Sequence, residues 1–288
     1  MEYTKIRLDF KYGPKNRFYR VVLIKGNPDL FKLSIMFGTV LGATFEHCFL
    51  ITCNNRKTKY VMAPFMENPL PGYNYIRKFH LSDLPDNFVF EYDTGDGWDF
   101  TCKKYRKLIE YKSNKNIILL EGAGQGIWED NICSLYALFE GDIDSDFDGE
   151  DAEKGIYKPW NFPVDKYSDF DQPLILEDEN ELLNEECESN LDEVLKNEKE
   201  YIKQSGLSLD NNGQFYNSRL KNAILNVVDE QIKTLPYVKD VYERLKSKKG
   251  EEKAKEAIAS VLVVYIYDME KKQLNFDDSE YKKRLEVL

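Results

Sequence analysis

The residues best suited to chemistry lie between Phe88 and Cys102 (FVFEYDTGDGWDFTC), where acidic side chains surround a glycine-containing turn. Aromatic residues alternate with other side chains around this turn, which predicts two β-strands. The two glycines tolerate positive φ, so we expect these strands to form a hairpin. Asp93, Asp96 and Asp99 would crowd its tip, where three carboxylates either face water or bind a cation.

A second acidic turn, at residues 121–130 (EGAGQGIWED), follows a predicted buried strand at residues 117–120. Its glycines lack the Lys and Ser or Thr of a phosphate-binding loop and the spacing of a dinucleotide-binding loop, so a nucleotide site is not favoured. Glu129 and Asp130 precede a helical pattern of apolar residues, and Asp130 suits the N-cap of that helix.

His47 is one of 2 histidines in the chain, and it lies in a predicted strand at residues 45–51. It suits a metal ligand or an acid–base group, or else a structural imidazole hydrogen-bonded at the end of a sheet. If the two acidic turns lie side by side, a cluster that suits a divalent metal ion forms from His47, Asp93, Asp96, Glu129 and Asp130. Otherwise Asp130 only caps a helix and the aspartates of the hairpin only fix a turn.

The two turns resemble those of the plasmid pRiA4b ORF-3-like family, whose members are also labelled IS1096 element passenger TnpR family proteins. The matching residues are Glu91-Tyr92-Asp93, Gly95-Asp96 and Trp98, and then residues 121–130. The resemblance covers roughly the first 180 residues. It implies a bacterial protein with a compact α+β domain, and it adds Tyr92 and Trp98 to the candidate functional residues. The label implies an association with a plasmid or another mobile element.

From residue 214 the apolar spacing becomes helical and predicts a small α-helical bundle. This segment is similar to one in uncharacterised bacterial proteins whose helices carry histidines four residues apart, a geometry that suits a metal. Lys221, Leu225, Lys255 and Ala259 occupy those positions here, so no metal site is expected in the bundle. We interpret the bundle as a packing or partner-binding element.

Basic residues follow the hairpin in a predicted long strand, at Lys103, Lys104, Arg106 and Lys107. Such a run can contact phosphates while the neighbouring Tyr105 stacks on a base. The alternative is the solvated face of an edge strand, which lysines protect from aggregation.

The composition of the chain is typical of a globular protein that carries neither disulfide bonds nor membrane spans. The 288 residues suit two domains, and an aromatic content of 14% is typical of a globular chain. The 5 cysteines include no Cys-x-x-Cys motif, which argues against a disulfide framework and a structural zinc site. The sequence has neither an apolar run of about 18 residues nor a signal peptide, so we expect a cytoplasmic protein that does not enter the membrane.

Acidic residues are concentrated in one part of the chain. The formal net charge is −11, but residues 140–200 contain 22 Asp or Glu and 5 Lys or Arg, so the remaining residues carry +6. We expect an α+β domain at residues 1–175, with a mixed sheet and a packed helix. An acidic linker or solvated helix at residues 176–213 and a helical bundle at residues 214–288 would follow.

Three functions compete. We favour a binding or accessory module with an unknown protein partner, because histidine is scarce and no pairing of a nucleophile with a base is visible. A metal-dependent hydrolase or phosphoryl-transfer enzyme would use His47 as base and the carboxylates of the two turns as ligands. Nucleic-acid binding through residues 103–112 is the third, and the acidic segment opposes it.

Overall fold

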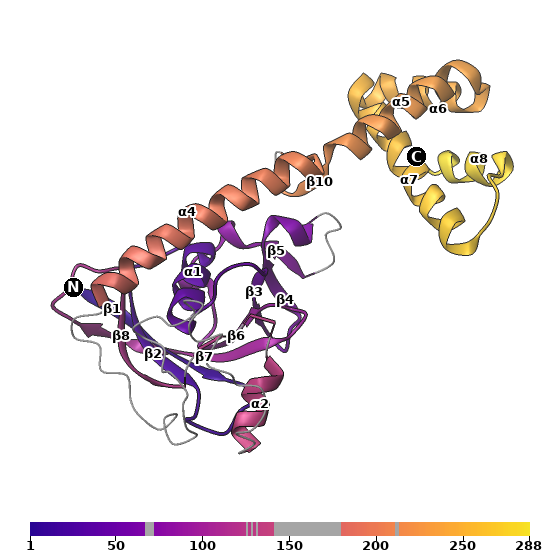
Figure 1. The fold of residues 1–288 in the computed structure, drawn as a ribbon. Coiled ribbons are helices and arrows are strands. Elements are labelled where there is room, and N and C mark those ends of the chain that lie inside the picture. The colour runs from indigo at the N-terminus through magenta and orange to yellow at the C-terminus, as the bar shows by residue number, and fades with distance from the viewer. Residues whose placement is uncertain (67–71, 125, 128, 131, 141–179, 211–212) are drawn as a thin grey trace. The chain divides into compact units, whose positions relative to one another are not determined.

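The computed structural model describes residues 1–66, 72–124, 126–127, 129–130, 132–140, 180–210 and 213–288. These residues divide into two compact units, Met1–Lys203 and Gln204–Leu288 (Figure 1). The first unit contains a mixed sheet with a helix on one face, and the second is mainly helical. The predicted α+β class is therefore confirmed.

One eight-stranded sheet organises the described part of the first unit. Its strands are β1 (Glu2–Phe10), β2 (Tyr19–Lys25), β3 (Phe49–Cys53), β4 (Thr58–Val61), β5 (Tyr73–Tyr75), β6 (Asn87–Tyr92), β7 (Trp98–Glu110) and β8 (Ile117–Ala123). The spatial order is β5-β4-β3-β6-β7-β1-β2-β8. Strands β4 and β5 run parallel, whereas the other neighbouring pairs in this sheet are antiparallel. Short 3-10 helices at Ala63–Met66, Ile76–Lys78 and Leu81–Asp83 connect β4, β5 and β6.

Helix α1 (Leu30–Leu41) lies against one face of this sheet. It begins after Asp29, whose side chain accepts a hydrogen bond from the N–H of Lys32, and it ends at Gly42, which has a φ of 88°. The ring of Phe37 contacts rings of β6 at centroid distances of 6.2 and 5.7 Å. The main hydrophobic core therefore lies between α1 and the strands β1, β3, β6 and β7.

The predicted hairpin is formed by β6 and β7, which pair from Asn87 opposite Lys103 to Tyr92 opposite Trp98. Alternate residues of β6, among them Phe90 and Tyr92, are buried in the core. Because strand side chains alternate between faces, Glu91 lies on the opposite face of the sheet. This alternation separates two groups of polar side chains at the same end of the hairpin, one on each face.

Helix α4 (Asn180–Ser205) lies in the segment expected to be an acidic linker or a solvated helix, and it differs from that expectation in that one of its faces packs on the first unit. The side chain of Asn184 accepts a hydrogen bond from the N–H of Asn116 and donates one to the carbonyl oxygen of Ile117. Glu198 is buried and pairs with Arg77 at 3.1 Å. These polar side chains bind β8 and the region around β5 rather than water, so the described helix belongs to the first unit as far as Lys203. The predicted boundary at residue 175 lies outside the described residues.

The second unit contains a short hairpin, β9 (Leu207–Leu209) and β10 (Phe215–Asn217), followed by a helical bundle. The helices are α5 (Ser218–Thr234), α6 (Pro236–Lys249), α7 (Glu251–Lys272) and α8 (Asp278–Glu286). In its core the rings of Tyr265 and Tyr281 stack with centroids 5.6 Å apart. Lys221 and Lys255 form ion pairs at 2.6 and 3.0 Å with carboxylates of neighbouring helices. Across the described ranges, none of the helices combines the length and apolarity needed to cross a membrane.

Candidate metal centre

Segments far apart in the sequence bring the two acidic turns together beside His47. This residue lies in the turn between α1 and β3, while Asp93 lies at the hairpin tip and Asp130 between β8 and α2 (Ile132–Glu140). The turn after β8 is fastened to the end of α1, because the N–H of Ile127 donates to the carbonyl oxygen of Leu41 at 2.7 Å. As a result, His47, Asp93 and Asp130 offer ligand atoms that lie within 4.8 Å of one another.

His47 stands at the centre of the group. Its Nε2 lies 3.3 Å from Oδ1 of Asp130 and 3.8 Å from Oε2 of Glu129. Two ligands of a tetrahedral ion, each at about 2.0–2.1 Å, are separated by about 3.4 Å, so these spacings suit a shared cation. The sequence placed His47 in a strand, but β3 begins only at Phe49. The side chain therefore projects from a turn rather than from a sheet ladder.

Glu129 is held in place through one carboxylate oxygen, and its other oxygen faces His47. Its Oε1 accepts hydrogen bonds from the Thr44 N–H and hydroxyl and from the Tyr92 hydroxyl, at 2.7, 2.8 and 2.7 Å. Its Oε2 is buried and makes no hydrogen bond to any described residue, and the same is true of His47 Nε2. Two buried atoms without a described hydrogen-bond partner face each other across 3.8 Å, an arrangement that a water molecule, a proton or a cation would satisfy.

Asp93 is fixed by the turn that it begins. Its backbone has a φ of 46°, and its Oδ1 accepts hydrogen bonds from the N–H groups of Gly95 and Asp96 at 3.0 and 3.3 Å. The same Oδ1 lies 3.8 Å from Nδ1 of His47, on the opposite side of the ring from Glu129. Asp93 thus fixes the turn, as one hypothesis expected, and also faces the imidazole, as the other expected.

Three other acidic or aromatic candidates have different surroundings. Asp96, like Glu129, is outside the group of converging ligand atoms, and its Oδ2 is buried without a hydrogen bond to a described residue. Trp98 is buried in the core, and its indole Nε1 likewise has no described partner. Asp99 points to the opposite face of the sheet from Tyr92 and binds basic side chains there.

Electrostatic conditions at the centre favour a cation. Three carboxylates surround one imidazole, and among the described residues the ion pairs of these carboxylates involve His47 alone. Burial, together with the adjacent Glu129 carboxylate, raises the pKa of the Tyr92 hydroxyl, which stays protonated and donates its hydrogen bond. Because a donor that orients a ligating carboxylate also tunes its affinity for a metal, Tyr92 and Thr44 are supporting residues of the site.

The predicted basic strand is divided among different roles. Lys104 donates to the carbonyl oxygen of Leu81 at 3.0 Å, and burial lowers its pKa. Arg106 pairs with Asp86 at 2.6 Å. Lys103 and Lys107 are exposed. β7 is a central strand between β6 and β1. Its pairing with β6 ends at Lys103, so beyond Lys103 the side of β7 that faces β6 is an edge.

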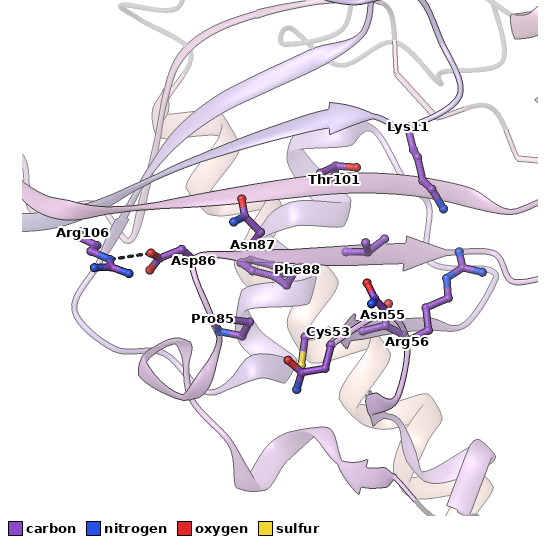
Figure 2. Close-up of a pocket in the computed structure, with 13 residues that line it drawn as sticks. Lys11, Cys53, Asn55, Arg56, Pro85, Asp86, Asn87, Phe88, Thr101 and Arg106 are labelled. Atoms are coloured by element: carbon purple, nitrogen blue, oxygen red, sulfur yellow. Dashed lines mark hydrogen bonds and ion pairs between the residues drawn. The ribbon is translucent and has the colours of Figure 1, made fainter.

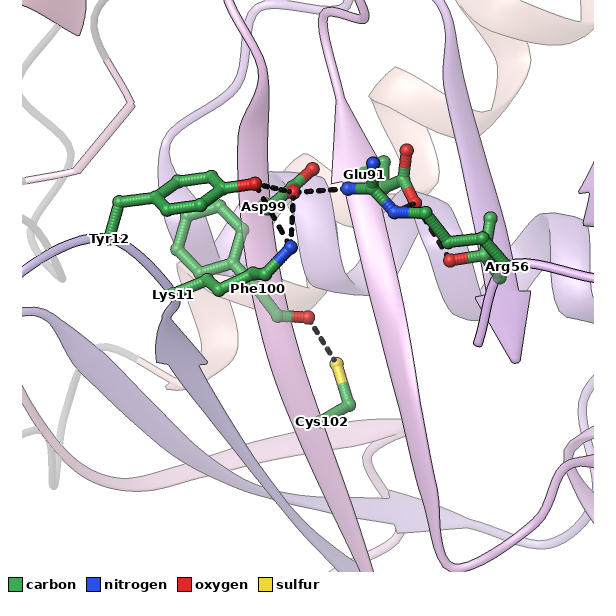
Figure 3. A network of polar contacts seen from close by, with 8 residues as sticks. Lys11, Tyr12, Arg56, Glu91, Asp99, Phe100 and Cys102 are labelled. Carbon is green, nitrogen blue, oxygen red and sulfur yellow. Dashed lines mark hydrogen bonds and ion pairs between the residues drawn. The ribbon is translucent and has the colours of Figure 1, made fainter. Parts of the chain in front are cut away.

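A polar network on the other face of the sheet was missed by the sequence analysis (Figure 3). Asp99, which is 3% exposed, accepts hydrogen bonds at one oxygen from Lys11, Tyr12 and Arg56. Arg56 also pairs with Glu91 at 3.2 Å. The only sequence signal was the alternation of β6 and β7, which places Glu91 and Asp99 on the same face.

Comparisons with known proteins were made for the whole chain. No protein-family model matches it, and no curated protein matches it. Among solved structures, it is similar to a protein of unknown function from Methanosarcina mazei Go1, with 18% sequence identity and a TM-score of 0.41. That likeness covers 52% of this chain and 86% of the other. A likeness at this level supports no inference about function.

Proposed function

We propose that this protein is a binding module that holds a divalent metal ion beside the β6–β7 hairpin. The ion is bound by His47 Nε2 and Asp130 Oδ1, which belong to the converging group, while Asp93 faces the second nitrogen of the imidazole. Glu129 lies outside that group, but its Oε2 faces His47 Nε2 at 3.8 Å and turns toward the ion as the third ligand. A mixed set of one nitrogen and two oxygen ligands suits Mn²⁺ or Zn²⁺ better than Mg²⁺ or Ca²⁺, which prefer oxygen alone.

The observation that carries this proposal is the pair of unsatisfied atoms, His47 Nε2 and Glu129 Oε2. Three donors hold the other oxygen of Glu129, so the carboxylate is oriented before any ligand arrives. A buried carboxylate oxygen without a partner is costly, and a cation at this point removes that cost.

A metal-dependent hydrolase is the second candidate, and the exposure of Asp130 favours it. This side chain is 75% exposed, so an ion beside it meets solvent and retains positions for water. A metal-bound water is the nucleophile that such hydrolysis requires. The two candidates share one site and differ in whether the metal-loaded protein turns over phosphate esters or other hydrolysable substrates.

We also infer that the chain is a divergent relative of the pRiA4b ORF-3-like family. In support, Tyr92, Asp93, Glu129 and Asp130, which belong to the two motifs of the resemblance, contribute to one constellation of side chains. The association with a mobile element, the cytoplasmic location and an unknown protein partner stay predictions. Nucleic-acid binding through the basic strand also stays a prediction: Lys104 donates to a backbone carbonyl and Arg106 pairs with Asp86, while Lys103 and Lys107 are exposed.

The test is thermal unfolding of the full chain, first stripped of metal, with Mn²⁺, Zn²⁺, Mg²⁺ or Ca²⁺ added. A metal at 100 times its dissociation constant stabilises the folded state by about 2.7 kcal/mol, which raises the melting temperature by several degrees. We expect this shift with Mn²⁺ or Zn²⁺ and its loss in Glu129→Gln, which keeps the hydrogen-bonded oxygen but removes the charge.

Glu46→Gln is the matched control, because Glu46 is an exposed carboxylate next to His47 in the sequence and is not one of the carboxylates that pair with His47. It should retain the full shift. The proposal is wrong if no metal stabilises the wild-type protein, or if Glu129→Gln is stabilised as strongly as the wild type and the control.

A further inference from the structure

A groove crosses β3, β6 and β7 on the face of the sheet that carries the Asp99 network (Figure 2). Its volume is about 880 Å³, which is within the range of small-molecule sites. Figure 2 shows Lys11 and Arg56 at one end of the groove and Arg106 with Asp86 at the other. The side chains of its lining include three cations and a single carboxylate, and each cation pairs with a carboxylate: Lys11 and Arg56 with Asp99, Arg56 also with Glu91, and Arg106 with Asp86.

Two carboxylates, the buried Asp99 and the partly buried Glu91, orient the cations at the first end. The side chains of Glu91 and Asp99 are 14% and 4% exposed, whereas that of Arg56 is 47% exposed and that of Lys11 is 35% exposed. The ion pairs of Arg56 use its Nε and Nη2, and the guanidinium also interacts with Tyr12. Since Lys11 and Arg56 bind the same oxygen of Asp99, their charged groups are neighbours at the surface of the groove.

The backbone at Arg56 is strained, which suggests that the position of its side chain serves a function. Asn54, Asn55 and Arg56 have φ values of 54°, 56° and 62° in the turn between β3 and β4. Each non-glycine residue in this region costs free energy, and such residues concentrate at binding sites. Here the strained turn places the guanidinium over the sheet, where the carboxylates of Glu91 and Asp99 hold it.

The remaining lining determines the class of ligand. Amide and hydroxyl groups from Asn54, Asn55, Asn87 and Thr101 provide donors and acceptors along the groove. Phe88 is the single aromatic residue of the lining, and it is 3% exposed, so it offers no surface on which a base could stack. A ligand with an anionic group and several hydroxyl groups fits these properties better than a nucleotide does.

We propose that the groove binds a phosphorylated sugar or polyol, with the phosphate at Arg56 and Lys11 and the hydroxyl groups along Asn87 and Thr101. Arginine is well suited to phosphate because its planar guanidinium can donate two parallel hydrogen bonds. This site lies on the opposite face of the sheet from Tyr92, and it is independent of the metal centre.

The test is calorimetric titration of the full chain in EDTA, so that a bound metal does not attract the phosphate. The probes are inorganic phosphate, glucose 6-phosphate, glucose and a ten-nucleotide oligothymidylate. We expect glucose 6-phosphate to bind more tightly than phosphate, and glucose and the oligonucleotide to bind more weakly than either. Arg56→Gln should lower the affinity for inorganic phosphate and for glucose 6-phosphate about 10- to 100-fold.

Arg7→Gln is the matched control, because Arg7 belongs to another Arg–Asp pair of the same sheet and does not line the groove. The affinity of Arg7→Gln for phosphate and glucose 6-phosphate should equal that of the wild type. Thr101→Val tests the second half of the proposal without touching a charge, and should weaken glucose 6-phosphate but not phosphate. Any one of four results would overturn the proposal. The first two are that the wild-type protein does not bind phosphate, and that Arg56→Gln binds it as tightly as the wild type does. The other two are that Thr101→Val keeps its affinity for glucose 6-phosphate, and that the oligonucleotide binds more tightly than glucose 6-phosphate.

Discussion

Replacing Tyr92 by phenylalanine should weaken the metal centre without removing any ligand. The hydroxyl of Tyr92 donates one of three hydrogen bonds to Glu129 Oε1, and Tyr92 is fully buried, so water does not take its place. Hydrogen bonds to charged groups contribute about 1.5–3 kcal/mol, and Thr44 keeps the other two in place. We therefore expect the free energy of unfolding of the metal-free protein to fall by about 2 kcal/mol.

The same change should lower metal affinity about 10- to 100-fold, which is the usual effect of losing a group that orients a ligand. Urea unfolding measures the first effect, and titration with Mn²⁺ measures the second. Tyr3→Phe is the control, because Tyr3 is also fully buried and its hydroxyl donates to two backbone carbonyl oxygens far from the centre in the chain. An unchanged metal affinity in Tyr92→Phe, or an equal loss in Tyr3→Phe, would refute the reasoning.

Two further predictions concern stability. Burial raises the pKa of Tyr281 to about 12, so its protonated form stabilises the fold below pH 10 and this contribution is lost as the pH rises toward 12. Tyr281→Phe should reduce the alkaline loss of unfolding free energy by about 2 kcal/mol, and identical pH profiles for both proteins would contradict this. Glu198→Ala should cost about 3 kcal/mol in urea unfolding, because Arg77 loses its buried partner, and a cost below about 1 kcal/mol would show that α4 is held by other contacts.

The hairpin was predictable because its signals are local. Alternating residues from Phe88 to Tyr92 define the strand, and a turn with two glycines follows within five positions. The helix at Leu30–Leu41 likewise has its cap at Asp29 and its end at Gly42. Such elements depend on neighbours in the chain, so sequence spacing is sufficient to place them.

The geometry of the candidate centre was not predictable in the same way. His47 and Glu129 meet only because the turn after β8 is bonded to the end of α1, and no pattern in the sequence encodes that contact. Nothing in the sequence distinguished Thr44 as a support for Glu129. Helix α4 was expected to be solvated because its composition is acidic, but composition does not show that Asn184 and Glu198 bind groups of the protein.

The most direct measurement of the central claim is anomalous X-ray scattering from crystals of the full chain grown with Mn²⁺. The account predicts an anomalous peak about 2.0–2.3 Å from His47 Nε2, Glu129 Oε2 and Asp130 Oδ1, with water in the remaining positions. A map that shows these three side chains clearly, with no peak between them, would contradict it.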